Sequence, residues 1–152
     1  MAARNGKYYL ICNYDKYSDV SNYRVDRIAD VRVLDEPTKP FGTLEGAERD
    51  RLDLAKYMAE HVFMYSGGNT QASFRIAKSM VGDVIELFGT DVRFSDETEE
   101  HVTATAYVNE QSMLHFAKVY APDVVILSPQ RLADQILTEA EKTLENYRKA
   151  GE

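Results

Sequence analysis

The sequence predicts an α+β protein with a strand-rich first part and a second part in which strands and helices alternate. The first forty residues are rich in tyrosine and β-branched residues, and polar turns interrupt them. Apolar residues then recur at helical spacing over 48–62. From residue 72 onward the apolar pattern switches repeatedly between the period of a strand and that of a helix.

The first part is expected to form three strands. Residues 7–14 have the composition of a strand, 15–19 form a polar turn, and 21–28 read as the returning strand. A third strand is predicted over 30–35, ending before Pro37. Three strands alone make a poor core, so either further strands precede Met1 or another part of the molecule completes the sheet.

A helix and a short loop are expected to join the two parts. The helix over 48–62 has an apolar face of Leu52, Ala55, Met58, Ala59 and Val62. Residues 66–70 are small and polar, which is typical of a domain boundary. We therefore divide the chain into residues 1–45, a linker over 46–70, and a domain over 71–152.

The second part begins with a predicted strand over 72–77. Ser79 is expected to cap a short helix that stops at Gly89. Strands are predicted over 91–95 and 101–108. Asn109 is expected to cap the next helix, whose inner stripe is Met113, Phe116, Ala117 and Tyr120.

The chain is expected to end with a buried strand and a long helix. Residues 124–127 read as a fully buried strand, and Pro129 is predicted to take the first helical position. The inward stripe of the helix is expected to be Leu132, Ile136, Ala140, Leu144 and Tyr147. This order predicts a ferredoxin-like βαββαβ domain with an extra C-terminal helix. Such a domain supports many functions and names none.

Composition narrows the class of protein. The chain has 152 residues, 44% of them hydrophobic and 28% charged, which is typical of a soluble globular protein. A net charge of −7 argues against binding of duplex DNA by the whole chain. Without an apolar span or a signal-peptide pattern, we expect a cytoplasmic protein that does not contact the membrane. The single cysteine, Cys12, is expected to be a buried free thiol.

Signatures of catalysis are weak. His61, His101 and His115 fall in three separate predicted elements, without cysteines or carboxylates at metal-ligand spacing, so each is expected on a surface or a helix face. The runs of acidic residues near 96–100 and 139–145 are expected to be solvated. We therefore expect no metal, no cofactor and no catalytic residue, and hence no enzyme.

One group of residues suggests binding. Five of the ten tyrosines fall in the first predicted hairpin, interleaved with Lys7, Lys16, Arg24 and Arg27. Aromatic rings stack on bases and guanidinium groups hold phosphates or carboxylates, so this sheet could bind a nucleotide or another anion. Alternatively, the tyrosines pair across strands for stability, and Arg24 simply holds Asp26.

Several segments resemble the WYL family of bacterial transcriptional regulators. Residues 6–10, Gly-Lys-Tyr-Tyr-Leu, resemble the family's Trp-Tyr-Leu signature, with Tyr8 in place of tryptophan. Residues 23–28, Tyr-Arg-Val-Asp-Arg-Ile, are similar to its Phe-Arg-Leu-Asp-Arg-Ile segment. Residues 52–57 and 63–67 resemble its linker, and the second part resembles the WCX extension domain that follows.

The resemblance implies a fold, partners and a site. It implies that residues 1–45 are part of a small Sm-like β-barrel, with its first strands and a DNA-binding winged helix upstream of Met1. It also implies a homodimer and an effector that is nucleotide-like or single-stranded nucleic acid. Tyr9, Arg24 and Arg27 would contribute to the effector site, with Tyr8 and Asn13 as further candidates, while Asp26 would orient an arginine. Two alternatives remain open: a purely structural dimerisation module and a small ferredoxin-like enzyme.

Overall fold

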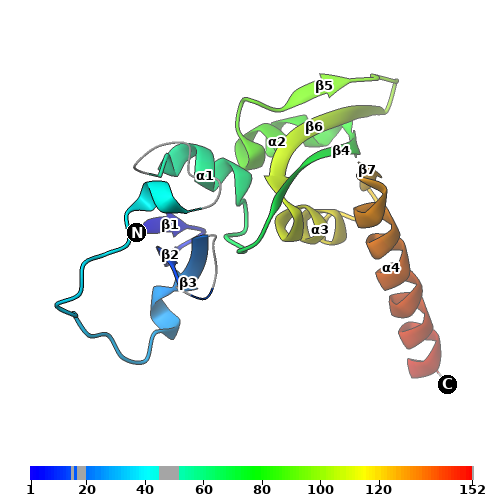
Figure 1. Cartoon of the computed structure of the whole chain (residues 1–152). Coiled ribbons are helices and arrows are strands. Elements are labelled where there is room, and N and C mark those ends of the chain that lie inside the picture. The colour runs from blue at the N-terminus through cyan, green and yellow to red at the C-terminus, as the bar shows by residue number, and fades with distance from the viewer. Residues whose placement is uncertain (15, 17–19, 45–51, 152) are drawn as a thin grey trace.

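The computed structural model describes residues 1–14, 16, 20–44 and 52–151. These residues form an α+β structure with two antiparallel sheets, one of three strands and one of four, which lie on either side of helix α1 (Figure 1). Neither sheet closes into a barrel within the described residues. The predicted turn at 15–19, apart from Lys16, and the predicted helix start at 48–51 lie outside them.

The small sheet contains strands β1 (Ala2–Arg4), β2 (Lys7–Asn13) and β3 (Val20–Arg24), in that order. Asn5 and Gly6 connect β1 to β2 with positive φ angles of 49° and 70°. A two-residue hairpin turn of this kind needs left-handed backbone at both positions, which asparagine and glycine adopt readily. Strand β1 was not among the predicted strands, although Asn-Gly is a strong hairpin signal.

Two expectations about the first part are wrong. The returning strand ends at Arg24, where the 3₁₀ helix η1 (Val25–Arg27) begins. Residues 30–35 form no strand, and Val31 and Val33 are exposed there. A β-branched run becomes a strand only when a neighbour satisfies its backbone groups, and within the described residues β1 rather than 30–35 supplies the third strand. A second short 3₁₀ helix, η2 (Phe41–Thr43), follows this stretch.

Helix α1 (Leu54–Glu60) covers one face of the small sheet. Asp53 caps it by accepting a hydrogen bond from the Lys56 amide. Tyr57 packs with Ala2 and Met64 in a small core that Tyr9 and other sheet residues border. The Tyr57 hydroxyl also donates to Asn22 Oδ1 at 3.0 Å, which ties the helix to β3.

The large sheet contains β4 (Asn69–Ala77), β5 (Arg93–Ser95), β6 (His101–Asn109) and β7 (Val124–Ser128). The strand order is β5-β6-β4-β7, and all pairs are antiparallel. Helix α2 (Val81–Phe88) lies between β4 and β5 in sequence, after the short η3 (Lys78–Met80), and α3 (Glu110–Val119) lies between β6 and β7. The predicted order of strand, helix, strand, strand, helix, strand is confirmed.

The main core lies between this sheet and helices α2 and α3. Alternate residues of the central strands, such as Phe74 and Ala104, are completely buried against helix residues such as Phe116. The intervening residues, such as Gln71, Arg75 and Tyr107, point to the opposite face of the sheet. One face of the large sheet therefore holds the core, and the other carries polar side chains.

Helix caps in this region follow the sequence in part. Asn109 caps α3 by accepting from the Ser112 amide, and α2 stops at Gly89, whose φ is 83°. Both features are as predicted. Ser79 is not a cap, because it lies within η3, and Met80 precedes α2 without a side-chain hydrogen bond.

The burial of the C-terminal strand and helix differs from the prediction. Strand β7 is an edge strand and is not fully buried. Val124 and Ile126 face the core, whereas Leu127 lies on the other face with 45% of its surface exposed. Helix α4 (Gln130–Ala150) follows Pro129, which is the N-cap rather than the first helical residue. Only Leu132 of the expected stripe is buried, and Leu144 and Tyr147 are 52% and 76% exposed. The helix leads away from the body, so nothing in the described chain covers its far half (Figure 1).

Candidate functional site

The predicted effector residues lie on two different faces of the small sheet. Tyr9 pairs with Arg24 and Asn13 with Val20, and residues directly opposite in an antiparallel pair point to the same side. Tyr9, Arg24 and Asn13 therefore share the face on which α1 packs. Tyr8 points to the other face and is 62% exposed. The structure brings together Tyr9 and Arg24. It places Asn13 at the other end of β2 on the same face, and Tyr8 on the opposite face.

Arg24 and Asp26 form a two-pronged ion pair. Arg24 Nε donates to Asp26 Oδ1 at 3.0 Å, and Nη2 donates to Oδ2 at 2.6 Å. These hydrogen bonds raise the pKa of Arg24 and lower the pKa of Asp26, and the charge of Lys7 lowers the pKa of Asp26 further. The prediction that Asp26 holds an arginine is confirmed for Arg24.

Lys7, Tyr9 and Arg24 gather at one end of the hairpin. Lys7 and Tyr9 are two residues apart on β2 and so share a face, and Arg24 lies opposite Tyr9. Arg27 follows at the end of η1, where its side chain is exposed. Three cations and one carboxylate thus lie at or near this end, beside the half-buried ring of Tyr9. We refer to Lys7, Tyr9, Arg24, Asp26 and Arg27 as the hairpin cluster.

The opposite face of the small sheet carries exposed aromatic and apolar side chains. Leu10 and Tyr23 form a cross-strand pair there, and both are substantially exposed. Tyr8 lies two residues before Leu10 and points the same way. Cys12 also belongs to this face. It is half-buried rather than buried as predicted, and partial burial raises the pKa of its thiol.

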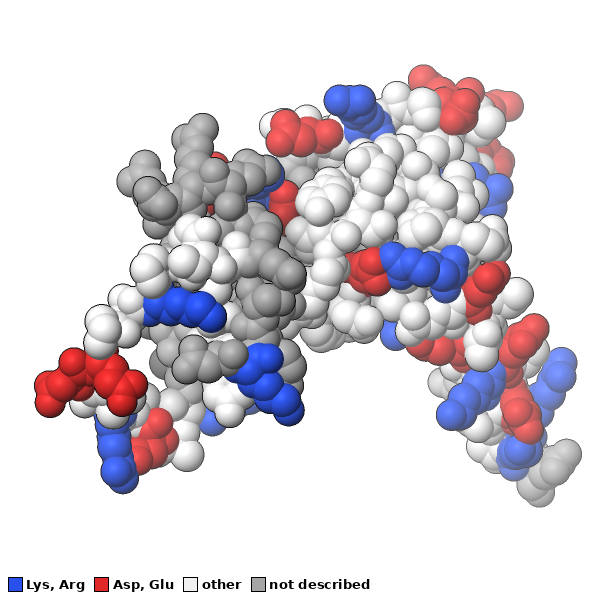
Figure 2. Space-filling model, viewed as in Figure 1, with Lys and Arg blue, Asp and Glu red and all other residues white. Residues whose placement is uncertain are grey.

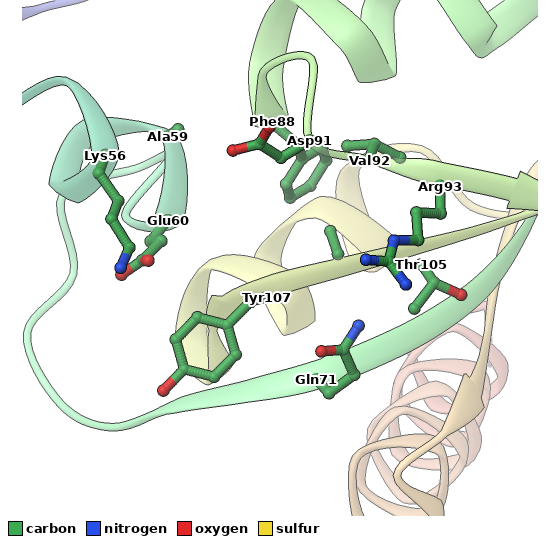
Figure 3. Close-up of a pocket in the computed structure, with 11 residues that line it drawn as sticks. Lys56, Ala59, Glu60, Gln71, Phe88, Asp91, Val92, Arg93, Thr105 and Tyr107 are labelled. Carbon is green, nitrogen blue, oxygen red and sulfur yellow. The ribbon is translucent and has the colours of Figure 1, made fainter.

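A pocket of about 380 Å³ lies away from the hairpin cluster, between α1 and the large sheet (Figure 3). Helix α1 contributes Lys56 and Glu60, the turn before β5 contributes Asp91, and β5 contributes Arg93. The central strands add Gln71, Thr105 and Tyr107, while Ala59, Phe88, Val92 and Ala106 complete the lining. This pocket was not predictable from the sequence, because its residues come from elements far apart in the chain.

The histidines form no metal centre. No three histidine, cysteine or acidic residues are placed to hold a metal ion in the described part of the chain. His61 is buried rather than on a surface, because it stacks on Tyr57 with ring centroids 3.9 Å apart. Its Nδ1 also lies 3.0 Å from the Tyr57 carbonyl oxygen, and burial lowers the pKa of the imidazole. His61 is therefore part of the packing between α1 and its surroundings.

Comparison with known proteins assigns no family. A scan of the chain against models of protein families finds no match. A search among curated proteins finds no match either. Among the described residues, no helix has both the length and the apolar character needed to cross a bilayer.

Proposed function

We propose that this chain is the effector-sensing region of a bacterial transcriptional regulator of the WYL type. In this proposal residues 1–45 belong to an Sm-like barrel and residues 71–152 form a ferredoxin-like WCX domain. The antiparallel four-stranded sheet and its strand and helix order support the second assignment. The protein works in the cytoplasm, and promoter DNA is bound by a winged helix outside this chain.

The hairpin cluster is the observation that carries the proposal. Lys7 and Arg24 share one face with the ring of Tyr9, and Arg27 follows at the end of η1. Guanidinium groups bind phosphates through hydrogen bonds, and aromatic rings stack on bases. Asp26 holds Nε and Nη2 of Arg24, so Arg24 would bind a phosphate through its remaining N–H groups. This chemistry suits a nucleotide-like molecule or single-stranded nucleic acid.

Effector binding acts on the rest of the molecule by population shift. A ligand changes an equilibrium between two arrangements only if it binds one of them more tightly. Tyr57 of α1 packs in the small core that Tyr9 borders and bonds Asn22, so the face that carries the cluster also contacts α1. A ligand that displaces Tyr9 or Arg24 would therefore change the packing of α1.

Fluorescence anisotropy with a short labelled single-stranded oligothymidylate tests the proposal. We expect salt-sensitive binding, because each phosphate contact contributes about −0.7 to the slope of log affinity against log salt concentration. Arg24→Ala and Arg27→Ala should weaken binding and reduce that slope. Arg32→Ala is the control, because Arg32 pairs with Asp30 outside the cluster and its side chain is 80% exposed. Equal loss in all three variants would show general charge attraction and contradict a site on the hairpin.

A structural dimerisation module is the second candidate, and α4 favours it. The helix has 21 residues, and Ala133, Leu137, Ala140, Leu144 and Tyr147 follow one another at alternating intervals of four and three. This is the spacing of a coiled-coil seam. Leu137, Leu144 and Tyr147 are exposed, and Figure 2 shows acidic and basic side chains interleaved along the helix.

Sedimentation velocity tests the dimer. We expect a concentration-dependent dimer that Leu137→Glu and Leu144→Glu convert to monomer, with little change in the thermal unfolding of the body. Lys142→Glu is the control, because it adds negative charge to the same helix outside the seam. A wild-type chain that stays monomeric at high concentration would remove this candidate.

A further inference from the structure

We propose that the pocket between α1 and the large sheet binds an α-amino acid with an apolar side chain, at a site separate from the hairpin cluster. Its volume of about 380 Å³ lies near the lower end of the range of about 300–1,000 Å³ that is typical of small-molecule sites. Five elements contribute to its lining: α1, α2, β4, β5 and β6. A ligand there would contact both the helix that packs on the small sheet and the polar face of the large sheet.

Arg93 provides the group that binds a carboxylate. It lies directly opposite Thr105 in the β5–β6 pair, and Gln71 lies opposite Tyr107 in the β4–β6 pair. All four side chains therefore share one face of the sheet. In Figure 3 the Arg93 guanidinium turns toward Thr105 and Gln71. Arg93 makes no ion pair with another described residue, so its paired N–H groups can hold a carboxylate between those two neutral side chains.

The opposite side of the pocket provides a group that binds an ammonium. Figure 3 shows the Asp91 carboxylate turned toward α1, away from the Arg93 guanidinium. Glu60 on α1 is already engaged, because Asn69 Nδ2 donates a hydrogen bond to it at 2.8 Å. Asp91 is therefore the acceptor that the lining offers to an ammonium.

Apolar side chains complete the lining. Phe88 is almost fully buried in the main core and reaches the pocket from the end of α2. Ala59 and Val92 lie beside it in the lining. A branched or aromatic side chain of the ligand would cover this surface, and binding would be favoured because apolar surface is removed from water. The lining therefore has distinct places for a carboxylate, an ammonium and an apolar group.

The balance of charge selects a zwitterion over a phosphate compound. Two cations, Lys56 and Arg93, and two acids, Glu60 and Asp91, line the pocket. A doubly charged phosphate beside both carboxylates would meet repulsion that a zwitterion avoids. The pocket and the hairpin cluster consequently differ in the ligands that they bind.

NMR titration of the ¹⁵N-labelled full chain with L-leucine, L-valine and L-phenylalanine tests the proposal. We expect saturable amide shifts at residues 56–60, 91–93 and 105–107 with at least one of the three. Two relatives of L-leucine serve as controls: 4-methylpentanoate, which lacks the ammonium, and 3-methylbutylamine, which lacks the carboxylate. Each should bind at least about tenfold more weakly, because one charge-assisted hydrogen-bonded group is missing.

Matched variants locate the binding. Arg93→Gln and Asp91→Asn should each weaken amino-acid binding by about tenfold or more. Two control variants should leave amino-acid binding unchanged: Arg75→Gln, which is on the same sheet face but outside the lining, and Asp83→Asn on α2. All four variants should keep the wild-type circular dichroism spectrum. Absence of shifts with all three amino acids, equal shifts with the two controls, or normal binding by Arg93→Gln would overturn the proposal. Oligothymidylate binding by Arg93→Gln should be unchanged, so failure here is distinguishable from failure of the hairpin site.

Discussion

Arg24 and Asp26 are joined by two hydrogen bonds, and this pair fixes the guanidinium of Arg24 at the end of the small sheet. Two effects of Asp26 on anion binding oppose each other. Its charge repels an anion, and its hydrogen bonds orient the arginine that binds one.

We predict that Asp26→Asn weakens oligothymidylate binding by about threefold or more, because one hydrogen-bonded orientation of Arg24 is lost. Asp30→Asn is the matched control. Asp30 forms an ion pair with Arg32, which is also two residues away in sequence, and this pair lies outside the cluster. Charge alone predicts tighter binding in both variants. Tighter binding by Asp26→Asn would show that Asp26 competes with the ligand rather than positioning Arg24.

The buried imidazole of His61 should make stability depend on pH. Burial lowers its pKa in the folded chain, while the unfolded value is about 6.5. The folded state therefore binds a proton less readily than the unfolded state. The stability contributed by neutral His61 is fully present above about pH 6.5, and it is lost as the pH falls through the lower pKa of the folded chain. Urea unfolding between neutral and mildly acidic pH measures this loss. His61→Gln should flatten the curve in that window and His101→Gln should not; parallel curves for wild type and His61→Gln would contradict the account.

Phe74 should be one of the most sensitive residues of the main core. It is fully buried, and its ring lies 5.6 Å from that of Phe88 and 5.9 Å from that of Phe116. Phe74→Ala should lower the free energy of unfolding by about 3–5 kcal/mol, because it leaves a cavity among these rings. Phe94→Ala, on the exposed edge strand β5, should cost less than about 1 kcal/mol. Similar costs in urea titrations of the two variants would show that the core does not lie between the sheet and α2 and α3.

Asn109 joins the start of α3 to the loop before β4. Its Oδ1 accepts from the Ser112 amide, and its Nδ2 donates to the Gly67 carbonyl at 3.0 Å. Asn109→Ala should destabilise the chain by about 2 kcal/mol, from the lost cap and the unsatisfied carbonyl. Asn146→Ala on the exposed part of α4 serves as the control in the same thermal or urea unfolding experiment. A cost no larger than the control's would rule out a structural role for this cap.

The second part of the fold was predictable because local signals agreed with tertiary contacts. Alternation over 101–108 placed one face of β6 in the core, and Asn109 and Gly89 marked helix ends. Burial at the edges was harder to predict. Val124 to Leu127 is apolar throughout, yet only alternate residues reach the core, because the helices cover one face of the sheet only. The far half of α4 has an apolar stripe that no other described element covers.

The candidate site was predictable by composition but not by geometry. The concentration of tyrosine and arginine identified the hairpin, and the Arg24–Asp26 pair followed from their spacing. Successive side chains of a strand point to opposite faces, and this alternation decides which residues meet. Tyr8 and Tyr9 are neighbours in sequence but lie on opposite faces. The pocket depends on residues such as Lys56, Arg93 and Tyr107, which only the tertiary structure brings together.

The central claim is that the hairpin cluster is the effector site, and chemical-shift mapping tests it most directly. The ¹⁵N-labelled chain is titrated with single-stranded oligothymidylate at low salt, and the amide shifts are assigned along the sequence. The account predicts saturable shifts concentrated at residues 7–13 and 20–28, with smaller shifts in α1, and a higher ligand concentration at half-saturation in Arg27→Ala. Shifts confined to the large sheet or α4, or no shifts at any concentration, would contradict it.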